Sequence, residues 1–402
     1  MIRMLTLSTL FPNSAQQSRG IFVEQRLRHL LRTGEVDARV VAPVPWFPSR
    51  SERFGRYAQL ARVPRRETRY GLEVWHPRYV LAPKITMVLA PLSLAIGVRS
   101  TVARIKREGF DFDIIDAHYY YPDGVAGALL ARWTGRPLVI TARGTDINLI
   151  PRYYWPRRMI LWASRMAAQS ISVCDALREE MVSIGMARGT IRTLRNGVDL
   201  EIFAPVDQDV ARRKLEWPAG PTLLSVGALI ERKGHDVLLR ALARLPGYRA
   251  VIVGKGNLEN KLRTLATRLG VADRVILAGE VSQQELKYYY SAADASVLAS
   301  SREGWANVLL ESMACGTPVI ASKVWGSPEV IRAREGGLLM EERTPEILAQ
   351  CICDLFASPP QRVATRRYAE GFSWEATAAG QIEVFAGILR SAEVSNNPKL
   401  SV

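Results

Sequence analysis

Two glutamates eight residues apart are the clearest sign of chemistry in this sequence. Glu303 lies in the turn SSREG, and Glu311 interrupts the apolar run that follows, within SSREGWANVLLESMACGTPVIAS, residues 300–322. We expect a helix to begin near residues 305–307, with Glu311 about two turns inside it. Carboxylates accept strong hydrogen bonds from hydroxyl groups, whereas a helix N-terminus favours an anion such as a phosphate. The stretch therefore predicts a ligand that carries both hydroxyls and phosphate.

A pair of cations predicts a second anion-binding turn. In SVGALIERKGHDVLLRAL, residues 225–242, Arg232 and Lys233 lie between a predicted strand and a predicted helix. Fixed charge, helix dipole and free N–H groups add together at such a position. A ligand with phosphates at its centre and polyols at both ends would satisfy this turn and the two glutamates together. A nucleotide sugar has that composition.

Short apolar strands alternate with amphipathic helices along the chain, which is typical of an α/β protein with parallel sheets. In the first half, strands are predicted at residues 2–8, 38–43, 112–118, 137–142, 169–174 and 190–198, a helix at 20–34, and a loop-rich insertion at 44–70. In the second half, strands are predicted at 222–229, 249–256, 273–279, 293–301 and 317–322. Two doubly wound, Rossmann-like sheets facing across a cleft are therefore expected, with the active site at the carboxyl ends of the strands.

The length of 402 residues indicates more than one domain. The turn residues of RNGVDLEIFAP, 195–205, predict a boundary there. We expect an acceptor-side domain over 1–200, a donor domain over 201–372, a helix over 373–390 that crosses back to the first domain, and a flexible tail over 391–402.

The second half closely resembles the carboxyl-terminal domain of retaining glycosyltransferases of family 4, which have the GT-B fold. The resemblance is carried by LSVGALIERKGHDVLLRAL, VIVGKG and VILAGEVSQQELKYYYSAADASVLASSREGWANVLLESMACGTPVIASKVWGSPEVI. Glu303 and Glu311 match the family's Glu-x7-Glu element, and LRNGVDLEIFAP is similar to its interdomain segment. Weaker elements of the first half are SRGIFVEQRLRHL, IDAHYYYPDG and TARGTDI. Among subgroups, the chain looks most similar to enzymes that build bacterial surface polysaccharides.

The resemblance implies a role for each matching residue of the second half. Lys233, with Arg232 beside it, would hold the donor diphosphate, and Glu311 would accept hydrogen bonds from the ribose hydroxyls. Glu303 would hold the transferred sugar, and Glu303 and Lys233 would be catalytic. Backbone N–H groups of the turn and helix start, at Gly304, Trp305, Ala306 and Asn307, would bind the sugar and its phosphate. The loop after the predicted strand 273–279 would line the base, at Gly279, Glu280 and Val281.

In the first half, the resemblance implies that His118 is catalytic and faces the sugar and the departing phosphate. Gly20 would let the backbone approach the diphosphate, where a side chain would obstruct it. The chain departs from the family at Ala228, where an arginine that binds the diphosphate is usual; Arg232 or Arg143 could replace it. Arg143 stands where many relatives have histidine, and Arg143 and Asp146 could contact donor or acceptor.

The resemblance also implies a reaction that retains the configuration at the sugar carbon. A carboxylate nucleophile is one route to retention; the route favoured for the family lets the leaving phosphate deprotonate the incoming hydroxyl on the same face. Cations and helix N–H groups would then neutralise the departing UDP or GDP, with no metal or other cofactor. The run Asp111-Phe112-Asp113 mimics an Asp-x-Asp metal motif, but it precedes a strand whose active-site end is expected to be the other one.

Positive charge is concentrated in the first half. Residues 1–200 hold 30 Lys and Arg against 16 Asp and Glu, whereas the second half holds 24 against 23, and the net charge is +15. Such an asymmetry favours an anionic partner. The stretch RYYWPRRMILWASRMA, residues 152–167, mixes arginines with aromatic side chains and suits an anionic membrane surface.

We therefore expect a cytoplasmic enzyme, peripheral on the inner face of the cytoplasmic membrane, that acts on a saccharide or lipid-linked acceptor. Variable loops at 44–70 and 79–90 would form the acceptor pocket. The four cysteines are expected to be reduced thiols, as in cytosolic proteins. The apolar stretch 85–98 has 14 residues, fewer than the roughly 20 that a spanning helix needs.

Three alternative functions share single features with this sequence. Gly254-x-Gly256 is part of a dehydrogenase fingerprint, but Glu259 stands where its third glycine belongs. A basic nucleic-acid-binding protein would share the charge of the first half, although a lipid-linked acceptor makes a membrane the more economical partner, and no nucleic acid is expected. A nucleotide-sugar epimerase of the same fold is the third alternative.

Overall fold

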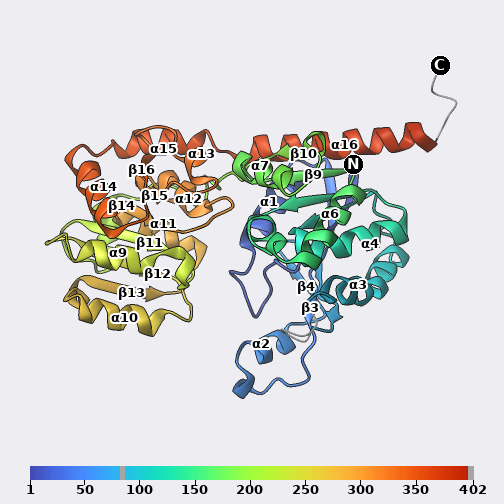
Figure 1. Cartoon of the computed structure of the whole chain (residues 1–402), viewed down its shortest axis with the longest axis horizontal. Helices are drawn as coiled ribbons and strands as arrows, with labels where there is room; N and C mark the ends of the chain where they lie inside the picture. The colour runs from blue at the N-terminus through green and yellow to red at the C-terminus, as the bar shows by residue number, and fades with distance from the viewer. Residues whose placement is uncertain (82–86, 397–402) are drawn as a thin grey trace. The chain divides into compact units, whose positions relative to one another are not determined.

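The computed structural model describes residues 1–81 and 87–396 and divides into two compact units. The first unit comprises Met1–Arg195 together with the chain from Glu375 onwards, and the second comprises Asn196–Trp374. The sequence placed these two boundaries after residues 200 and 372. Each unit contains a sheet of its own, as the ribbon in Figure 1 shows.

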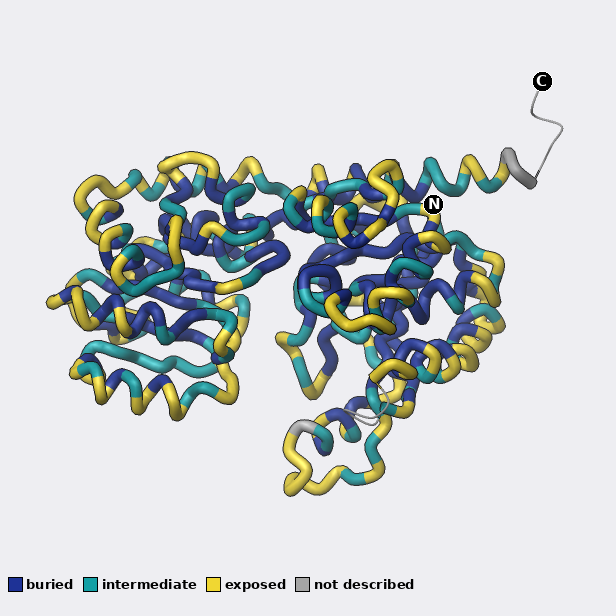
Figure 2. Tube along the Cα trace, in the orientation of Figure 1, coloured by how far each residue is buried: buried dark blue, intermediate teal, exposed yellow. Residues whose placement is uncertain are grey.

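Within the described residues, the first unit is built on an eight-stranded sheet in the order β10-β9-β8-β7-β1-β2-β5-β4. The strands are β1 (Ile2–Leu7), β2 (Val36–Val41), β4 (Arg66–Arg69), β5 (Leu72–Trp75), β7 (Ile114–His118), β8 (Leu138–Ala142), β9 (Gln169–Ser172) and β10 (Ile191–Thr193). Neighbours pair in parallel except β4 and β5, which form an antiparallel hairpin. The central strands are almost continuously apolar because helices cover both faces of the sheet, and Figure 2 shows them buried.

The helices of the first unit connect these strands. They are α1 (Ile21–Arg32), α2 (Arg56–Arg62), α3 (Ala90–Arg107), α4 (Val125–Thr134), α5 (Thr145–Asn148), α6 (Tyr154–Met166) and α7 (Asp175–Ser183), with a two-stranded sheet of β3 (Val44–Pro45) and β6 (Arg78–Tyr79). The insertion at 44–70 is therefore more ordered than predicted, since it contains β3, α2 and β4. Of the predicted acceptor loop 79–90, residues 82–86 lie outside the described residues.

The last helix, α16 (Trp374–Asn396), belongs to the core of the first unit. Its Ala378, Val384 and Phe385 are buried in one cluster with Val23 and Leu27 of α1. The predicted flexible tail at 391–402 is wrong for residues 391–396, because the helix continues through them. Residues 397–402 lie outside the described residues.

The second unit, which is described throughout, has a six-stranded parallel sheet in the order β13-β12-β11-β14-β15-β16. Its strands are β11 (Thr222–Val226), β12 (Arg249–Val253), β13 (Val275–Gly279), β14 (Ala295–Leu298), β15 (Val319–Ser322) and β16 (Gly337–Met340). Its helices are α8 (Gln208–Lys214), α9 (His235–Leu242), α10 (Glu259–Arg268), α11 (Gln283–Ala292), α12 (Asn307–Ala314), α13 (Ser327–Val330), α14 (Pro345–Ala357) and α15 (Arg362–Glu370). β16 was not predicted.

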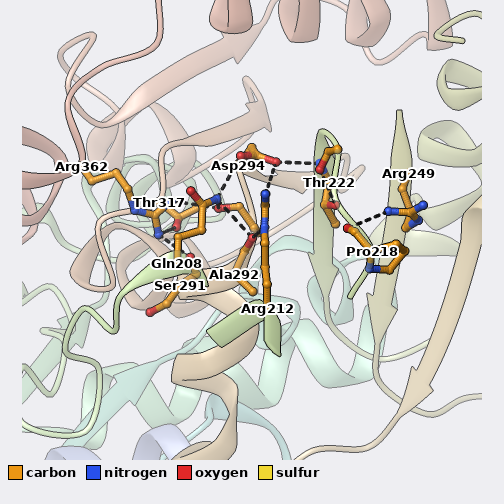
Figure 3. Close-up of polar contacts among 12 residues, drawn as sticks. Gln208, Arg212, Pro218, Thr222, Arg249, Ser291, Ala292, Asp294, Thr317 and Arg362 are labelled. Carbon is orange, nitrogen blue, oxygen red and sulfur yellow. Dashed lines mark hydrogen bonds and ion pairs between the residues drawn. The ribbon is translucent and has the colours of Figure 1, made fainter. Parts of the chain in front are cut away.

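A polar network fixes the amino ends of the strands in the second unit (Figure 3). Asp294, directly before β14, accepts hydrogen bonds from the backbone N–H of Thr222, at the start of β11, and from Arg212 of α8, both at 2.7 Å. Gln208 of α8 donates to the other carboxylate oxygen at 3.0 Å. The carboxylate thus ties two neighbouring strands to one helix.

The guanidinium of Arg362, at the start of α15, completes this network (Figure 3). It donates to the carbonyl oxygens of Ser291 at 2.8 Å and Ala293 at 2.9 Å, and to the hydroxyl of Thr317 at 2.7 Å. Most of these acceptors are main-chain carbonyls at the end of α11, where the helix itself supplies no further N–H donors. The amino edge of the sheet is therefore held by charges bonded to backbone.

Candidate active site

The predicted donor residues of the second unit meet at the carboxyl edge of its sheet. Arg232 and Lys233 lie in the single-turn helix η5 (Glu231–Lys233), which follows β11, and Glu303 lies in the turn after β14. β11 and β14 are neighbouring parallel strands, so the segments after them come together. The sequence placed these residues about 70 positions apart and could not show that they touch.

Glu303 is buried and forms ion pairs with both cations. Its Oε1 lies 2.6 Å from Nζ of Lys233 and accepts from the Ser300 hydroxyl at 2.7 Å, and its Oε2 lies 3.1 Å from a guanidinium nitrogen of Arg232. Burial raises the pKa of Glu303, but the charges of Lys233 and Arg232 outweigh burial and hold the pKa below its usual value. Glu303 is therefore a charged acceptor at neutral pH.

Gly234 lets the segment that holds Arg232 and Lys233 lie close to the segment after β14, which holds Glu303. Its φ is +71°, and a Cβ built on it would lie 1.9 Å from the carbonyl oxygen of Ala299, at the end of β14. Only glycine fits both the left-handed conformation and this close approach. The backbone of Arg232 is fixed in the same way, since its carbonyl accepts from the N–H of Ser301 at 2.9 Å. These two contacts position the cations beside Glu303.

The N-terminus of α12 lies directly after the glutamate turn. Its N-cap residue is Ala306, and no side chain caps the helix. The N–H of Leu309, in the first turn, donates to the carbonyl of Ala306 at 3.1 Å. Trp305 is buried, and its indole nitrogen has no hydrogen-bond partner among the residues that the structure describes. The side-chain carbonyl of Asn307 accepts from Asn196 at 3.2 Å. An anion would find donors here that the protein itself does not use.

Glu311 is the fifth residue of α12 and lies about one turn inside it, not two. It is buried, and Oε2 accepts a hydrogen bond from the Tyr290 hydroxyl at 2.9 Å. Burial raises the pKa of Glu311 to about 7, and the bond from Tyr290 only partly opposes this. The carboxylate therefore loses its charge within the physiological pH range. Sequence reasoning missed Tyr290, which is the third of three consecutive tyrosines in α11.

The remaining predicted donor residues make fewer contacts. Gly279 ends β13 with φ +73°, and Glu280 beside it forms an exposed ion pair with Lys255 at 3.5 Å. Position 228, where the family usually has an arginine, is an alanine and supplies no cation. Its carbonyl accepts from Nε2 of His235 at 3.3 Å. Val281, which follows Glu280, is partly buried.

In the first unit, His118 ends β7 and is almost fully buried. Its Nδ1 lies 2.7 Å from a guanidinium nitrogen of Arg143, and its Nε2 lies 3.0 Å from Oδ2 of Asp116. A guanidinium can only donate, so Nδ1 must accept, Nε2–H donates to Asp116, and the ring is neutral. Burial lowers the pKa of His118; Asp116 opposes this and Arg143 adds to it. A direct contact of this imidazole with the sugar stays a prediction.

Arg143 directly follows β8, and Asp146 lies in the short helix α5 that comes next. Burial lowers the pKa of Arg143 to about 9. Asp146 is fully buried and accepts from the backbone N–H groups of Tyr120 at 2.8 Å, Arg143 at 3.1 Å and Gly144 at 2.7 Å. The Asp146 carboxylate thus organises its own loop, and its predicted contact with a donor or acceptor is untested.

Gly20 precedes α1 with φ +67°, and a Cβ there would lie 2.3 Å from the carbonyl oxygen of Leu10. The chain therefore has an internal reason for this glycine, separate from the predicted approach of a diphosphate.

Asp123 and Gln381 were not singled out from the sequence. Asp123 is fully buried and accepts from the Thr9 hydroxyl at 2.9 Å, while its Oδ1 has no partner within the described part of the chain. Burial raises the pKa of Asp123 to about 7. Its signal was an Asp-Gly pair in the segment that follows β7, five residues after His118.

Gln381 of α16 donates to Oδ2 of Asp116 at 3.1 Å and accepts from Arg26 at 2.8 Å. No local pattern marks it.

The mimic of an Asp-x-Asp motif lies at the amino end of β7. Asp111 pairs with Lys106 at 2.9 Å and Arg136 at 2.7 Å, and Asp113 accepts from the backbone N–H of Arg3 at 2.8 Å. Among residues 1–81 and 87–396, no cluster of three His, Cys, Asp or Glu side chains could hold a metal ion. Over the same residues, no helix combines the length and the apolar composition needed to cross a membrane.

Comparison with known families covers most of the chain. Residues 60–202 match the model of Glycosyltransferase Family 4, and residues 207–372 match that of glycosyl transferases group 1. A D-inositol 3-phosphate glycosyltransferase of Acidothermus cellulolyticus is 34% identical over 328 residues, which are 74% of this chain and 72% of that protein. The chain belongs to the family 4 glycosyltransferases.

Solved structures agree with this family in fold. Sucrose-phosphate synthase from Thermosynechococcus elongatus aligns with a TM-score of 0.81 at 20% identity, over 97% of this chain and 100% of that one. HepE of Anabaena in complex with UDP-glucose aligns with a TM-score of 0.72 at 20% identity, over 96% and 100%.

This family 4 glycosyltransferase therefore has the predicted α/β GT-B fold with two Rossmann-like domains. It is a nucleotide-sugar-dependent transferase. Membership does not favour the alternative functions, an epimerase or a nucleic-acid-binding protein.

Proposed function

We propose that this glycosyltransferase moves a sugar from a UDP- or GDP-linked donor to a hydroxyl of a saccharide or lipid-linked acceptor, with retention and without a metal, in cell-surface polysaccharide biosynthesis. One observation carries the proposal: Lys233, Arg232 and Glu303 converge beside the uncapped N-terminus of α12. In this proposal the enzyme is cytoplasmic and peripheral on the inner face of the membrane.

The charges of the site suit the departure of a nucleoside diphosphate. As the glycosidic oxygen of the donor takes the electron pair of the breaking bond, negative charge grows on the phosphates. Lys233, Arg232 and the N-terminus of α12 would stabilise that charge, because the two cations are held in place by Glu303 and the helix that follows Glu303 has no side-chain cap. The acceptor hydroxyl attacks the same face, and its proton goes to the leaving phosphate. Glu303 and Glu311 then act as acceptors for sugar and ribose hydroxyls.

Substitution of Lys233 tests the donor assignment. Lys233→Ala is expected to abolish transfer or to raise the donor KM strongly, while the melting temperature stays close to that of the wild type. Lys214→Ala is the matched control, since Lys214 is an exposed lysine of α8 in the same unit. Nucleotide sugars are first screened by thermal shift to find the donor. Full activity of Lys233→Ala would remove the donor site from this edge of the sheet.

Two solution measurements test retention and metal independence. The anomeric configuration of the product, followed by NMR from the start of the reaction, is expected to equal that of the donor. Activity is expected to survive EDTA. An inverted product, or an absolute requirement for manganese, would contradict the corresponding part of the proposal.

A phosphorylated cyclitol is a second candidate acceptor. The relative from Acidothermus cellulolyticus is named a D-inositol 3-phosphate glycosyltransferase. At the carboxyl ends of β1 and β2, Thr9, Asn13, Gln16 and Arg19 line a narrow hollow together with Val44 and Leu60 of the predicted acceptor insertion. The hollow, of about 10 Å³, admits no more than one water-sized group, so a polyol phosphate would be held at its polar rim, beside Arg19. Product formation from inositol 3-phosphate, but not from inositol, would support this acceptor, and turnover of lipid-linked saccharides alone would exclude it.

A further inference from the structure

Three helices of the first unit, α3, α4 and α6, contain no acidic residue. α4 packs against both α3 and α6, so the three form one continuous layer over the sheet. Their exposed cations are Arg99, Arg104, Arg107, Arg132, Arg157, Arg158 and Arg165, of which Arg104 pairs with Glu108 at 2.8 Å. Acidic side chains reappear at both limits of this layer, in Glu108 after α3 and in α7. We call this surface the α3–α4–α6 face.

The same face exposes large apolar and aromatic side chains. Leu92 and Ile96 of α3 are 46% and 60% exposed, and they lie four residues apart on one side of the helix. Arg99, one turn further along, stacks over the ring of Trp133, which ends α4 and is 42% exposed. Apolar anchors and cations therefore alternate along a single stripe.

α6 extends the stripe with an aromatic pair. Tyr154 and Trp155 are 64% and 56% exposed and contact each other edge to face, with ring centroids 5.2 Å apart. Arg158 lies over the Tyr154 ring and donates to its hydroxyl at 2.9 Å. Aromatic rings with a polar tip, held beside guanidinium groups, suit the boundary between lipid head groups and acyl chains.

The topology places part of this stripe, at the starts of α3 and α6, at the carboxyl edge of the first sheet. α3 leads into β7, α4 leads from β7 to β8, and α6 leads into β9, all of them parallel strands. Helices that join parallel strands begin at the carboxyl edge. Leu92, near the start of α3, and the Tyr154–Trp155 pair, at the start of α6, therefore lie toward the edge that carries His118.

We propose that the α3–α4–α6 face is the surface by which this enzyme contacts an anionic lipid bilayer. Leu92, Ile96, Trp133 and Trp155 enter the head-group boundary, and the surrounding arginines pair with lipid phosphates. The charge of this face favours a membrane over a protein partner. Three adjacent helices without a carboxylate repel other basic surfaces, and they offer an acidic protein no pattern of alternating charges by which it could be recognised specifically. The inference deepens the proposed function, since a lipid-linked acceptor is reached at such a surface.

Vesicle sedimentation of the full chain, without a donor, tests the proposal. Binding is expected with phosphatidylglycerol–phosphatidylethanolamine vesicles and not with pure phosphatidylcholine vesicles, and it is expected to weaken as salt is added. The double variant Leu92→Gln with Ile96→Gln should lower the affinity at least about tenfold without changing net charge. Its matched control is Val210→Gln with Val363→Gln, two exposed valines of the second unit.

Replacement of arginines by glutamine tests the proposed pairing of arginines with lipid phosphates. Arg132→Gln with Arg165→Gln should lower affinity for anionic vesicles about tenfold, whereas Arg240→Gln with Arg268→Gln in the second unit should not. Nucleotide binding by thermal shift is measured on every variant and is expected to be unchanged. If the wild type binds no nucleotide sugar, the proposed function is refuted. The vesicle measurements test the membrane proposal separately, because they use no donor.

Three outcomes would overturn the membrane proposal. One is the absence of vesicle binding, and another is equal loss in the control variants. The third is a different partner: a gel shift with duplex DNA that exceeds vesicle affinity, or a dimer in light scattering that the Leu92→Gln, Ile96→Gln variant dissolves.

Discussion

The two edges of the sheet in the second unit use the same residue types for different purposes. At the amino edge, Asp294 and Arg362 are bonded mainly to backbone groups and to neutral side chains, apart from the pair between Asp294 and Arg212 (Figure 3). At the carboxyl edge, Glu303 and Lys233 are bonded chiefly to one another. A charge bonded to the backbone stabilises the chain itself. Charges bonded to one another, beside a helix end without a cap, can exchange those bonds for bonds to a ligand.

Charge removal at the carboxyl edge should have the largest effect on activity. Glu303→Gln is expected to lower kcat/KM at least about 1,000-fold, because the sugar loses a charged acceptor and the two cations lose the group that orients them. The free energy of unfolding should change by less than about 2 kcal/mol, since both cations keep partial access to water. Steady-state kinetics and urea unfolding measure the two effects. A variant that keeps its activity, or that does not fold, would break the comparison.

Removal of a charge at the amino edge should lower the stability of the protein and leave its kcat/KM unchanged. Asp294→Ala is expected to lower the free energy of unfolding by about 3 kcal/mol, because a strand N–H, Arg212 and Gln208 all lose their acceptor. The kcat/KM of the protein that remains folded should equal the wild-type value. Urea unfolding and active-fraction kinetics at low temperature check this. A fall in kcat/KM beyond the unfolded fraction would show that the two edges are coupled.

Substitution of Glu311 should affect both stability and donor binding, and its effect on stability should depend on pH. Burial raises its pKa to about 7, so the folded chain holds this proton more tightly than the unfolded chain does. The wild type therefore loses stability as pH rises from about 4.5 to 7, by up to about 3 kcal/mol. Glu311→Gln avoids this loss, so its unfolding free energy should exceed that of the wild type at pH 8 and not at pH 4.

The same substitution should weaken donor binding. The amide of Glu311→Gln accepts hydrogen bonds from hydroxyls less strongly than a carboxylate, so calorimetry is expected to show about tenfold lower donor affinity at pH 8. A variant that is less stable at pH 8 would contradict the burial argument. A variant with unchanged affinity would remove Glu311 from the donor site.

The smallest expected effect extends the comparison to the first unit. There, polar side chains at the carboxyl end of β7 contact one another: Nε2–H of the neutral His118 donates to Asp116, and Gln381 supplies Asp116 with one further donor. Gln381→Leu should lower kcat several-fold and leave the donor KM unchanged, because Asp116 then fixes the His118 tautomer less well. Its pH–rate profile should shift with it.

Thr377→Val is the control for Gln381. It removes one hydrogen bond, from the Thr377 hydroxyl to the carbonyl of Arg195, on the same helix. Equal losses of stability with an unchanged pH–rate profile in both variants would give Gln381 a structural role only.

The sequence predicted most strands of both sheets, the edge strands β10 and β13 included. β1 and β7–β15 all lie inside their predicted ranges, because most of them are short apolar runs between turn residues, whereas β2 begins two residues before its range. The hairpin of β4 and β5 was missed because β4 is RETR, an exposed strand with no apolar alternation. β16, with only four residues, carries too little pattern to be distinguished from a loop.

The candidate site was predicted in its residue types but not in its contacts. Glu303, Glu311 and Lys233 could be named because each breaks a local pattern. The ion pair of Glu303 with Lys233, the bond from Tyr290 to Glu311 and the burial that raises the pKa of Glu311 depend on strand order. A sequence pattern contains no information on neighbours across a sheet, so these could not be derived.

The final helix has a consequence for the order in which the molecule can be made. The first unit needs Ala378, Val384 and Phe385 to close its core, yet these residues are translated only after the whole second unit. During synthesis, the apolar side chains of α1 that they cover therefore stay exposed until the second unit has been translated. Expression of residues 1–195 alone should therefore yield an aggregation-prone fragment, and a short linker from Arg195 to Glu375 should restore a well-behaved one.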